Sequence, residues 1–241
     1  MKVMKNMKFG AMALGLSLVF TACSSDDSVD TPLQGSLKIA AKANYNNVLN
    51  RSGENAVSLS KFIVNFKEIE LERSDADEDL IDGFFGSDDD IELKGPFEID
   101  LLSGNSIQLA TVEIPNGIYE EIEFEFDKSE NEASDLYGKS MKLTGEINGQ
   151  PFVFWHDFEE EIEIDYEDSN KNLVIDNNTK EILINFDLNA VMDMIDLSTA
   201  TDTDGDGLIT ISPDDEDGNN DLAELIKEAI KTQIDLMEDQ D

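Results

Sequence analysis

Regular alternation of apolar and charged residues is the feature that most constrains the fold of this chain. In the stretch IYEEIEFEF, the apolar residues Ile122, Phe124 and Phe126 alternate with glutamates. Side chains of a β-strand point alternately to its two faces, so a period of two predicts a strand with one buried and one charged face. The same period recurs over residues 35–188, and turn signals such as Pro-Asn-Gly at 115–117 divide it into short segments.

About ten such segments, with almost no helical pattern between them, predict an all-β domain over residues 35–188. We expect an antiparallel β-sandwich of the immunoglobulin or transthyretin kind, because hairpin turns join strands that run in opposite directions. The alternation changes phase between Phe66 and Ile69, which predicts a β-bulge there. The acidic segment 74–90 interrupts the pattern and is predicted to be a long loop.

The first 22 residues resemble a bacterial lipoprotein signal peptide. Lys2, Lys5 and Lys8 precede an apolar run at 9–20, which is shorter than the roughly 20 residues that a membrane-spanning helix needs. The run ends in Phe-Thr-Ala-Cys, which resembles a lipobox and implies cleavage before Cys23 and triacylation of that cysteine. An ordinary signal peptide with an incidental cysteine is the alternative.

A triacylated Cys23 would hold the protein on a membrane, because two or more acyl chains give stable anchoring. Residues 23–34 are polar and acidic, which is typical of a flexible tether. An acidic run directly after the cysteine resembles the surface-export signal of lipoproteins from Gram-negative Bacteroidota. It implies an outer-membrane protein that faces the medium, with a periplasm-facing protein as the alternative. The net charge of −38 makes nucleic acid an unfavourable partner.

The stretch DTDGDG carries three carboxylates at alternating positions. Asp202, Asp204, Asp206 and Gly207 match the first, third, fifth and sixth positions of an EF-hand calcium loop. Calcium binds about six to eight oxygen atoms, and glycine permits the left-handed backbone that a tight curl around the ion requires. The sequence therefore predicts a calcium site with a structural role. A solvated acidic turn is the alternative.

The second half of this loop departs from the EF-hand pattern. We expect Leu208 to offer a backbone carbonyl and Thr210 a side-chain or water-mediated ligand. The twelfth position holds Pro213 in place of the usual glutamate. Asp214 or Asp215 is therefore expected to close the site from a differently shaped loop.

Residues 189–241 have a helical rather than an alternating pattern. A short helix is predicted at 190–199, and apolar residues at helical spacing predict a second helix from Leu222 to Met237 with Asp221 as its N-cap. The calcium loop lies between them. We therefore expect a helix–loop–helix appendage that packs on the sandwich, with a partner-binding helix as the alternative.

Signals for catalysis are weak. His156 is the only histidine, and no G-x-S-x-G motif accompanies it. We therefore expect a protein that is not an enzyme. Trp155, Tyr119 and Tyr166 are candidates for stacking on a glycan. The alternatives are packing at the start of a strand for Tyr119 and a core or rim position for Trp155. Acidic pairs are too numerous to identify a glycosidase, so a carbohydrate-active enzyme, or an accessory subunit of one, stays an alternative.

Two short motifs carry a family resemblance. Asp100-Leu101-Leu102 and the segment from Pro115 to Tyr119, PNGIY, resemble the core of an uncharacterised domain family of bacterial surface lipoproteins. The resemblance implies a β-sandwich in the cell envelope and transfers no catalytic residues. Together with the tether and the calcium loop, it predicts a lipid-anchored binding or structural module whose ligand is a glycan or an envelope protein. A purely structural lipoprotein is the alternative.

Overall fold

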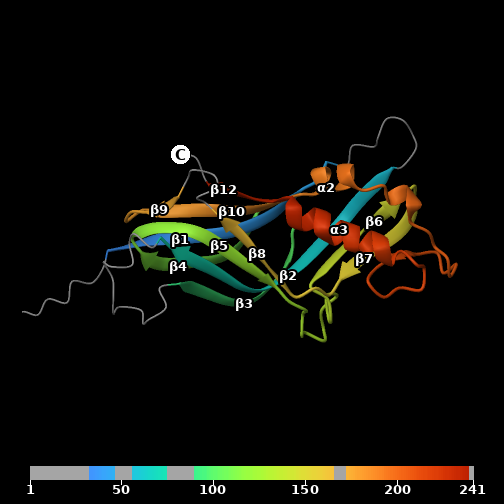
Figure 1. The fold of residues 1–241 in the computed structure, drawn as a ribbon, viewed down its shortest axis with the longest axis horizontal. Coiled ribbons are helices and arrows are strands. Elements are labelled where there is room, and N and C mark those ends of the chain that lie inside the picture. The colour runs from blue at the N-terminus through green and yellow to red at the C-terminus, as the bar shows by residue number, and fades with distance from the viewer. Residues whose placement is uncertain (1–32, 47–55, 75–89, 166–171, 239–241) are drawn as a thin grey trace, which may run out of the picture. The chain divides into compact units, whose positions relative to one another are not determined.

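The computed structural model places most of the predicted β domain and the segment that follows it (Figure 1). These residues belong to a compact unit from Pro32 to Asp241. The described residues are 33–46, 56–74, 90–165 and 172–238. The predicted signal peptide, the lipidation site Cys23 and the aromatic residue Tyr166 lie outside them.

The fold is mostly β, as the alternation predicts. The described residues form twelve strands, two α-helices and one short 3-10 helix. Their bounds are β1 (Gln34–Asn44), β2 (Val57–Arg73), β3 (Ile91–Asp100), β4 (Ile107–Pro115), β5 (Gly117–Phe126), β6 (Met141–Ile147), β7 (Gln150–His156), β8 (Glu160–Asp165), β9 (Leu173–Ile175), β10 (Thr179–Asp187), α2 (Leu188–Met194), η2 (Leu197–Thr199), β11 (Ile209–Ile211), α3 (Asn220–Thr232) and β12 (Ile234–Glu238).

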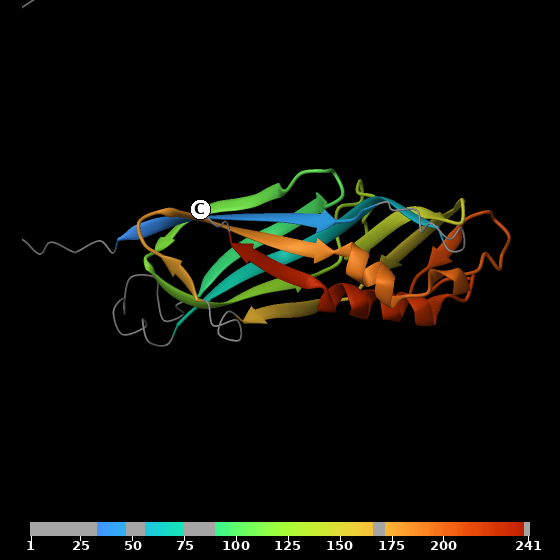
Figure 2. The same cartoon turned by 90° about the horizontal axis from the view of Figure 1, so that it is seen from above.

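The strands form two sheets that share one apolar core. One sheet has the order β12-β10-β1-β4, and the other follows the path β11-β7-β6-β2-β5-β8, with β3 also paired to β2 and β9 to β5. Figure 2 shows β1, β10 and β12 side by side. The predicted antiparallel pairing holds for most neighbouring strands of the described residues, but it was wrong at two places, where β1 pairs with β10 and β11 pairs with β7 in parallel. Alternation fixes the faces of a strand but says nothing about its direction.

Strand β2 connects the two halves of the larger sheet. It is 17 residues long and pairs with β3 on one edge, while its other edge pairs first with β6 and then with β5. The register shifts between Phe66 and Glu68 on both edges, so the predicted β-bulge is confirmed. The extra residue, Lys67, restores the phase and lets Phe66 and Ile69 both point into the core.

Aromatic side chains fill the centre of this core. The rings of Phe66 and Phe126 lie 4.8 Å apart between centroids, and those of Phe62 and Phe186 lie 5.6 Å apart in an edge-to-face arrangement. All four side chains are buried. Such pairs contribute about 0.5–1.5 kcal/mol beyond the burial of their area. The first pair joins β2 to β5 within the larger sheet, and the second joins β2 to β10 across the two sheets.

The C-terminal segment differs from the prediction. Helix α3 ends at Thr232, and the residues from Ile234 form β12, which pairs antiparallel with β10. The helical stripe predicted to Met237 was therefore too long, because the sequence after Gln233 also alternates and completes an open sheet edge. The N-cap is Asn219 and not Asp221. Helix α3 lies against α2, β7 and β11 (Figure 1).

No helix among the described ranges is long and apolar enough to cross a membrane.

Candidate metal centre

The acidic loop, defined here as residues 202–217, connects the 3-10 helix η2 to α3 and contains β11. Asp202, Asp204 and Asp217 each present one carboxylate oxygen, and these oxygen atoms all lie within 4.8 Å of one another. The structure therefore brings two of the predicted calcium ligands together with a third carboxylate that was not predicted.

Glycine allows the first half of the loop to curl. Gly205 and Gly207 adopt positive φ angles of 77° and 91°, which residues with a Cβ atom rarely adopt. The curl turns their N–H groups toward Asp202, whose Oδ1 accepts from Gly205 at 2.7 Å and whose Oδ2 accepts from Gly207 at 3.0 Å. The same pattern continues where Asp204 accepts from the N–H of Asp206. These bonds orient the carboxylates before any cation arrives.

Asp217 closes the loop from its far side. Its side chain is 6% exposed and accepts from the backbone N–H groups of Thr203, Asp204 and Thr210 at 2.7, 3.1 and 2.8 Å. Burial raises the pKa of Asp217, but the N–H groups of Thr210, Asp204 and Thr203 lower it, and the pKa lies below its ordinary value. Asp217 is therefore a charged carboxylate at neutral pH.

The two residues predicted to close the site have other positions. Asp214 is exposed. The oxygen atoms of Asp215 accept from the N–H groups of Ser212, Gly218 and Asn219, so this carboxylate shapes the turn before α3. Neither residue belongs to the converging group, and Asp217 takes the place that the sequence interpretation gave to them.

The remaining predicted ligands surround the group without joining it. Asp206 is exposed, and its Oδ1 accepts from the N–H of Leu208 at 2.7 Å. Leu208 and Thr210 are half-buried at the start of β11. The carbonyl of Thr210 accepts from the side-chain amide of Asn219 at 2.7 Å. This arrangement leaves Asp202, Asp204 and Asp217 as the centre of the site.

Hydrogen bonds connect the acidic loop to the rest of the fold. Gln150, at the start of β7, donates its side-chain N–H to Asp202 Oδ2 at 2.8 Å. Asn219, which directly precedes α3, is buried and bonds through its side-chain amide to the backbone of Thr201 and Thr210. A change in the loop therefore reaches both the larger sheet and α3.

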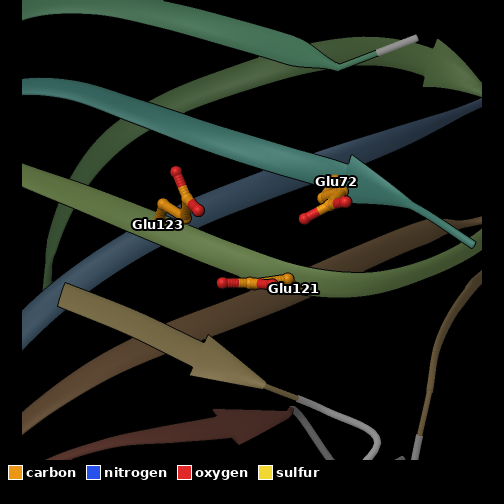
Figure 3. A group of neighbouring side chains, drawn as sticks. All are labelled: Glu72, Glu121 and Glu123. Carbon is orange, nitrogen blue, oxygen red and sulfur yellow. The ribbon is translucent and has the colours of Figure 1, made fainter. Parts of the chain in front are cut away.

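A second group of carboxylates lies on the charged face of the larger sheet. Glu72 on β2 and Glu121 and Glu123 on β5 point toward one another, with one oxygen from each within 4.8 Å (Figure 3). A hydrogen bond to Glu161 and partial burial raise the pKa of Glu123 to about 8. Because a proton already compensates the repulsion there, this group is a weaker candidate for a metal than the acidic loop.

A family model described as "Domain of unknown function (DUF4382)" matches residues 54–197. The chain belongs to this family. The predicted membership of an uncharacterised domain family is confirmed at that level. Searches of the curated proteins and of the solved structures find no match. The DUF4382 match runs from the start of β2 to Leu197, so the acidic loop and α3 follow it.

All three aromatic residues proposed to contact a glycan fall within the DUF4382 match, and the structure describes Tyr119 and Trp155. Tyr119 lies in the core with 0% exposure, and its hydroxyl donates to the carbonyl of Pro115 at 3.0 Å. The interpretation of Tyr119 as a stacking residue was therefore wrong, since its position at the start of β5 turns it inward. Trp155 is half-buried, and the Lys139 ammonium lies 5.2 Å from its ring centroid.

His156 has a structural position at the end of β7 in the DUF4382 region. It is 5% exposed, and its Nδ1 accepts from the N–H groups of Asp157 and Phe158, both at 3.0 Å. The ring proton is therefore on Nε2, which donates to Glu224 of α3 at 3.0 Å. His156 therefore connects α3 to the larger sheet.

Proposed function

We propose that this protein is a lipid-anchored module of the cell envelope whose acidic loop binds one calcium ion. The observation that carries the proposal is the convergence of Asp202, Asp204 and Asp217 within 4.8 Å. Calcium–oxygen distances are about 2.3–2.6 Å, so two ligand atoms on opposite sides of one ion lie roughly 5 Å apart. The spacing of the three oxygen atoms suits a single calcium ion.

The donor set also suits calcium. All three side chains offer hard oxygen ligands, which calcium prefers over nitrogen or sulfur. In this proposal Asp217 replaces the missing EF-hand glutamate, and Asp206 and the carbonyl of Leu208 complete the coordination. Thr210 is not a ligand in this proposal. Its backbone N–H donates to Asp217 and holds that carboxylate in place.

The ion has a structural role in this proposal. Repulsion among three carboxylates opposes the closed loop, and a divalent cation would remove that repulsion. Since Asp202 bonds to β7 and Asn219 bonds across the loop, the ion would strengthen the contact of α3 with the larger sheet. Extracellular calcium modules bind their ion with a Kd of roughly 10⁻⁴–10⁻³ M, which matches a permanently occupied site outside a cell.

The envelope location rests on the N-terminal sequence. Three lysines, a short apolar run and Phe-Thr-Ala-Cys support lipidation at Cys23, and the acidic residues after it support export to the outer surface. A Cys23→Ser variant should leave the membrane fraction and accumulate in soluble form. Protease added to intact cells should degrade a surface-exposed protein and spare a periplasm-facing one.

We further propose that the two sheets form a sandwich of the immunoglobulin or transthyretin kind, and that the module binds a glycan or an envelope protein or serves a purely structural role. The alternative of a carbohydrate-active enzyme requires two carboxylates about 5–10 Å apart beside a sugar-sized cleft. Glu123 and Glu161 are hydrogen-bonded to each other, and the cavity beside them has a volume of about 30 Å³. This pair therefore has no room for a sugar, and a carbohydrate-active enzyme would need another pair of carboxylates.

Thermal unfolding with and without calcium tests the proposal. At about 2 mM calcium, a site with a Kd of ~10⁻⁴ M stabilises the folded state by about 2 kcal/mol, which corresponds to roughly 4–8 °C in Tm. Asp204→Asn should remove this shift, and Asp214→Asn, a matched change at an exposed residue outside the group, should keep it. Equal melting temperatures with calcium and with a chelator would contradict the proposal.

A further inference from the structure

A cavity lies beside Asn65 and Lys67 of β2, between β3 and the loop that connects β5 to β6. Its volume is about 640 Å³, and the rest of its lining is Gly95, Pro96, Glu98 and residues 127–131. This volume lies in the range of small-molecule sites, about 300–1,000 Å³. None of the acidic-loop residues lines it.

The cavity forms where β2 changes its neighbour from β6 to β5. At this point the N–H of Asn65 donates to Ser140, and the N–H of Asp127 donates to the carbonyl of Asn65, so the connecting loop begins and ends beside one residue. The bulge at Lys67 lies two residues further along. A β-bulge redirects side chains, and such irregularities occur preferentially at functional sites.

Asn65 has an unsatisfied acceptor at this position. Its side chain is 2% exposed, and its Nδ2 donates to the carbonyl of Asp127 at 2.8 Å, which fixes the orientation of the amide. Its Oδ1 has no hydrogen-bond partner among the described residues. Buried polar atoms are nearly always paired, so a donor from outside the fold, either a water molecule or a ligand group, would satisfy this oxygen.

Glu98 is held in place beside this acceptor. It lies directly across from Asn65 in the β2–β3 register. The hydroxyl of Ser129 donates to its Oε2 at 2.9 Å, and the hydroxyl of Ser134 donates to its Oε1. Among the described residues, no lysine or arginine forms an ion pair with Glu98. Its charge is therefore oriented without being neutralised.

The lysines that line the cavity already have partners. Lys67 pairs with Glu125 at 2.7 Å and Lys128 pairs with Glu159 at 2.5 Å, and both glutamates lie outside the lining. The hydroxyl of Ser129 is used by Glu98. The charge of each lysine is therefore shared with a glutamate outside the lining, while the carboxylate of Glu98 has no cationic partner among the described residues. A ligand that pairs with Glu98 must bring a positive charge.

We propose that this cavity binds a small organic molecule through a primary ammonium group. An ammonium group has three N–H donors, and the lining residues Asn65, Glu98 and Asp127 carry acceptor oxygens. Each carboxylate has lone pairs beyond those used within the fold. The recognised feature is the N–H donor and not charge alone.

Nuclear magnetic resonance titration with n-butylammonium chloride at constant ionic strength tests this inference. The titration uses the protein without residues 1–23, because this truncation leaves the compact unit from Pro32 to Asp241 intact. We expect saturable shifts of the backbone amide resonances at Gly95, Glu98 and residues 127–131. Tetramethylammonium has the same charge and no N–H, and it should give no saturable shift at these residues. Equal binding of the two cations, or no saturation with butylammonium, would overturn the inference.

Two variants locate the binding. Glu98→Gln should weaken butylammonium binding at least tenfold, and Glu113→Gln, a matched change at an exposed residue of β4, should leave it unchanged. If Glu98→Gln loses the dispersed amide spectrum of the folded protein, Asp127→Asn serves in its place with the same expectation. Wild-type affinity in the folded variant would overturn the assignment.

Discussion

The carboxylate of Asp217 accepts a 2.7 Å hydrogen bond from the backbone N–H of Thr203, which lies 14 residues earlier in the chain. The strand β11 lies between these two residues, so this bond draws the two ends of the acidic loop together. Thr210, within β11, donates to the same carboxylate. Asp217 thus shapes the loop and also supplies one of the three converging charges.

Asp217→Asn should destabilise the protein even without calcium. An amide presents only one acceptor atom, so it cannot accept from all three N–H groups that now bond to the carboxylate. We expect the free energy of unfolding to fall by about 1–3 kcal/mol in urea denaturation with a chelator present. Asp214→Asn at the exposed neighbour should change it by less than about 0.5 kcal/mol. Equal effects of the two variants would mean that Asp217 has no special role.

Stability should decrease as the pH rises through 8, and Glu123 is the reason. Its pKa is about 8 in the folded protein and 4.5 in an ordinary setting. Between these values the folded state holds a proton that the unfolded state lacks, so acidification from pH 8 toward 5 stabilises the protein. Glu123→Gln should weaken this dependence, because the amide donates to Glu161 without titrating.

Urea midpoints at pH 6 and pH 9 measure that dependence. Glu113→Gln changes a glutamate on the other sheet and should keep the wild-type difference between the two midpoints. A Glu123→Gln variant with the same difference as the wild type would contradict the assignment of the raised pKa to Glu123.

Ending the chain after Gln233 should destabilise the protein and promote aggregation. This truncation keeps α3 and removes β12, which leaves the backbone groups of the β10 edge unpaired. Chemical denaturation and light scattering measure the two effects. A chain that ends after Glu238 retains β12 and should match the full-length protein. If both truncations behave alike, the residues from Ile234 contribute no strand to the sheet.

Tyr119→Phe should lower stability and leave ligand binding unchanged. The variant removes the hydroxyl that donates to the buried carbonyl of Pro115, and we expect a loss of about 1–2 kcal/mol in the free energy of unfolding. Tyr137 is 50% exposed, so Tyr137→Phe should have almost no effect. A Tyr119→Phe variant that is as stable as the wild type would contradict the structural role of this hydroxyl.

Features with local causes could be predicted from the sequence. The phase change around Phe66 led to the correct position of the bulge, because one extra residue is visible as a break in the alternation. The strand directions of β1 and β10 could not be predicted, since no short turn connects them. The final strand was misassigned because Ile234 fits both a helical stripe and an alternating pattern, and pairing with β10 decided between them.

In the candidate site, too, the features with local causes could be predicted from the sequence and the others could not. The spacing of Asp202 and Asp204 follows from local turn chemistry, and Gly207 adopts the positive φ that the pattern requires. Asp217 lies among other acidic residues in DDEDGNND, and no local signal separates it from Asp214 or Asp215. Its burial depends on contacts with Thr203 and Thr210, which only the folded chain brings together.

Isothermal titration calorimetry with calcium on the protein without residues 1–23 tests the central claim most directly. The wild type should bind one calcium ion with a Kd of roughly 10⁻⁴–10⁻³ M. The double variant Asp202→Asn and Asp204→Asn should give no binding heat, while Asp214→Asn should bind like the wild type. The same weak heat in all three proteins, or none in the wild type, would show that the acidic loop holds no calcium and is held closed by its hydrogen bonds alone.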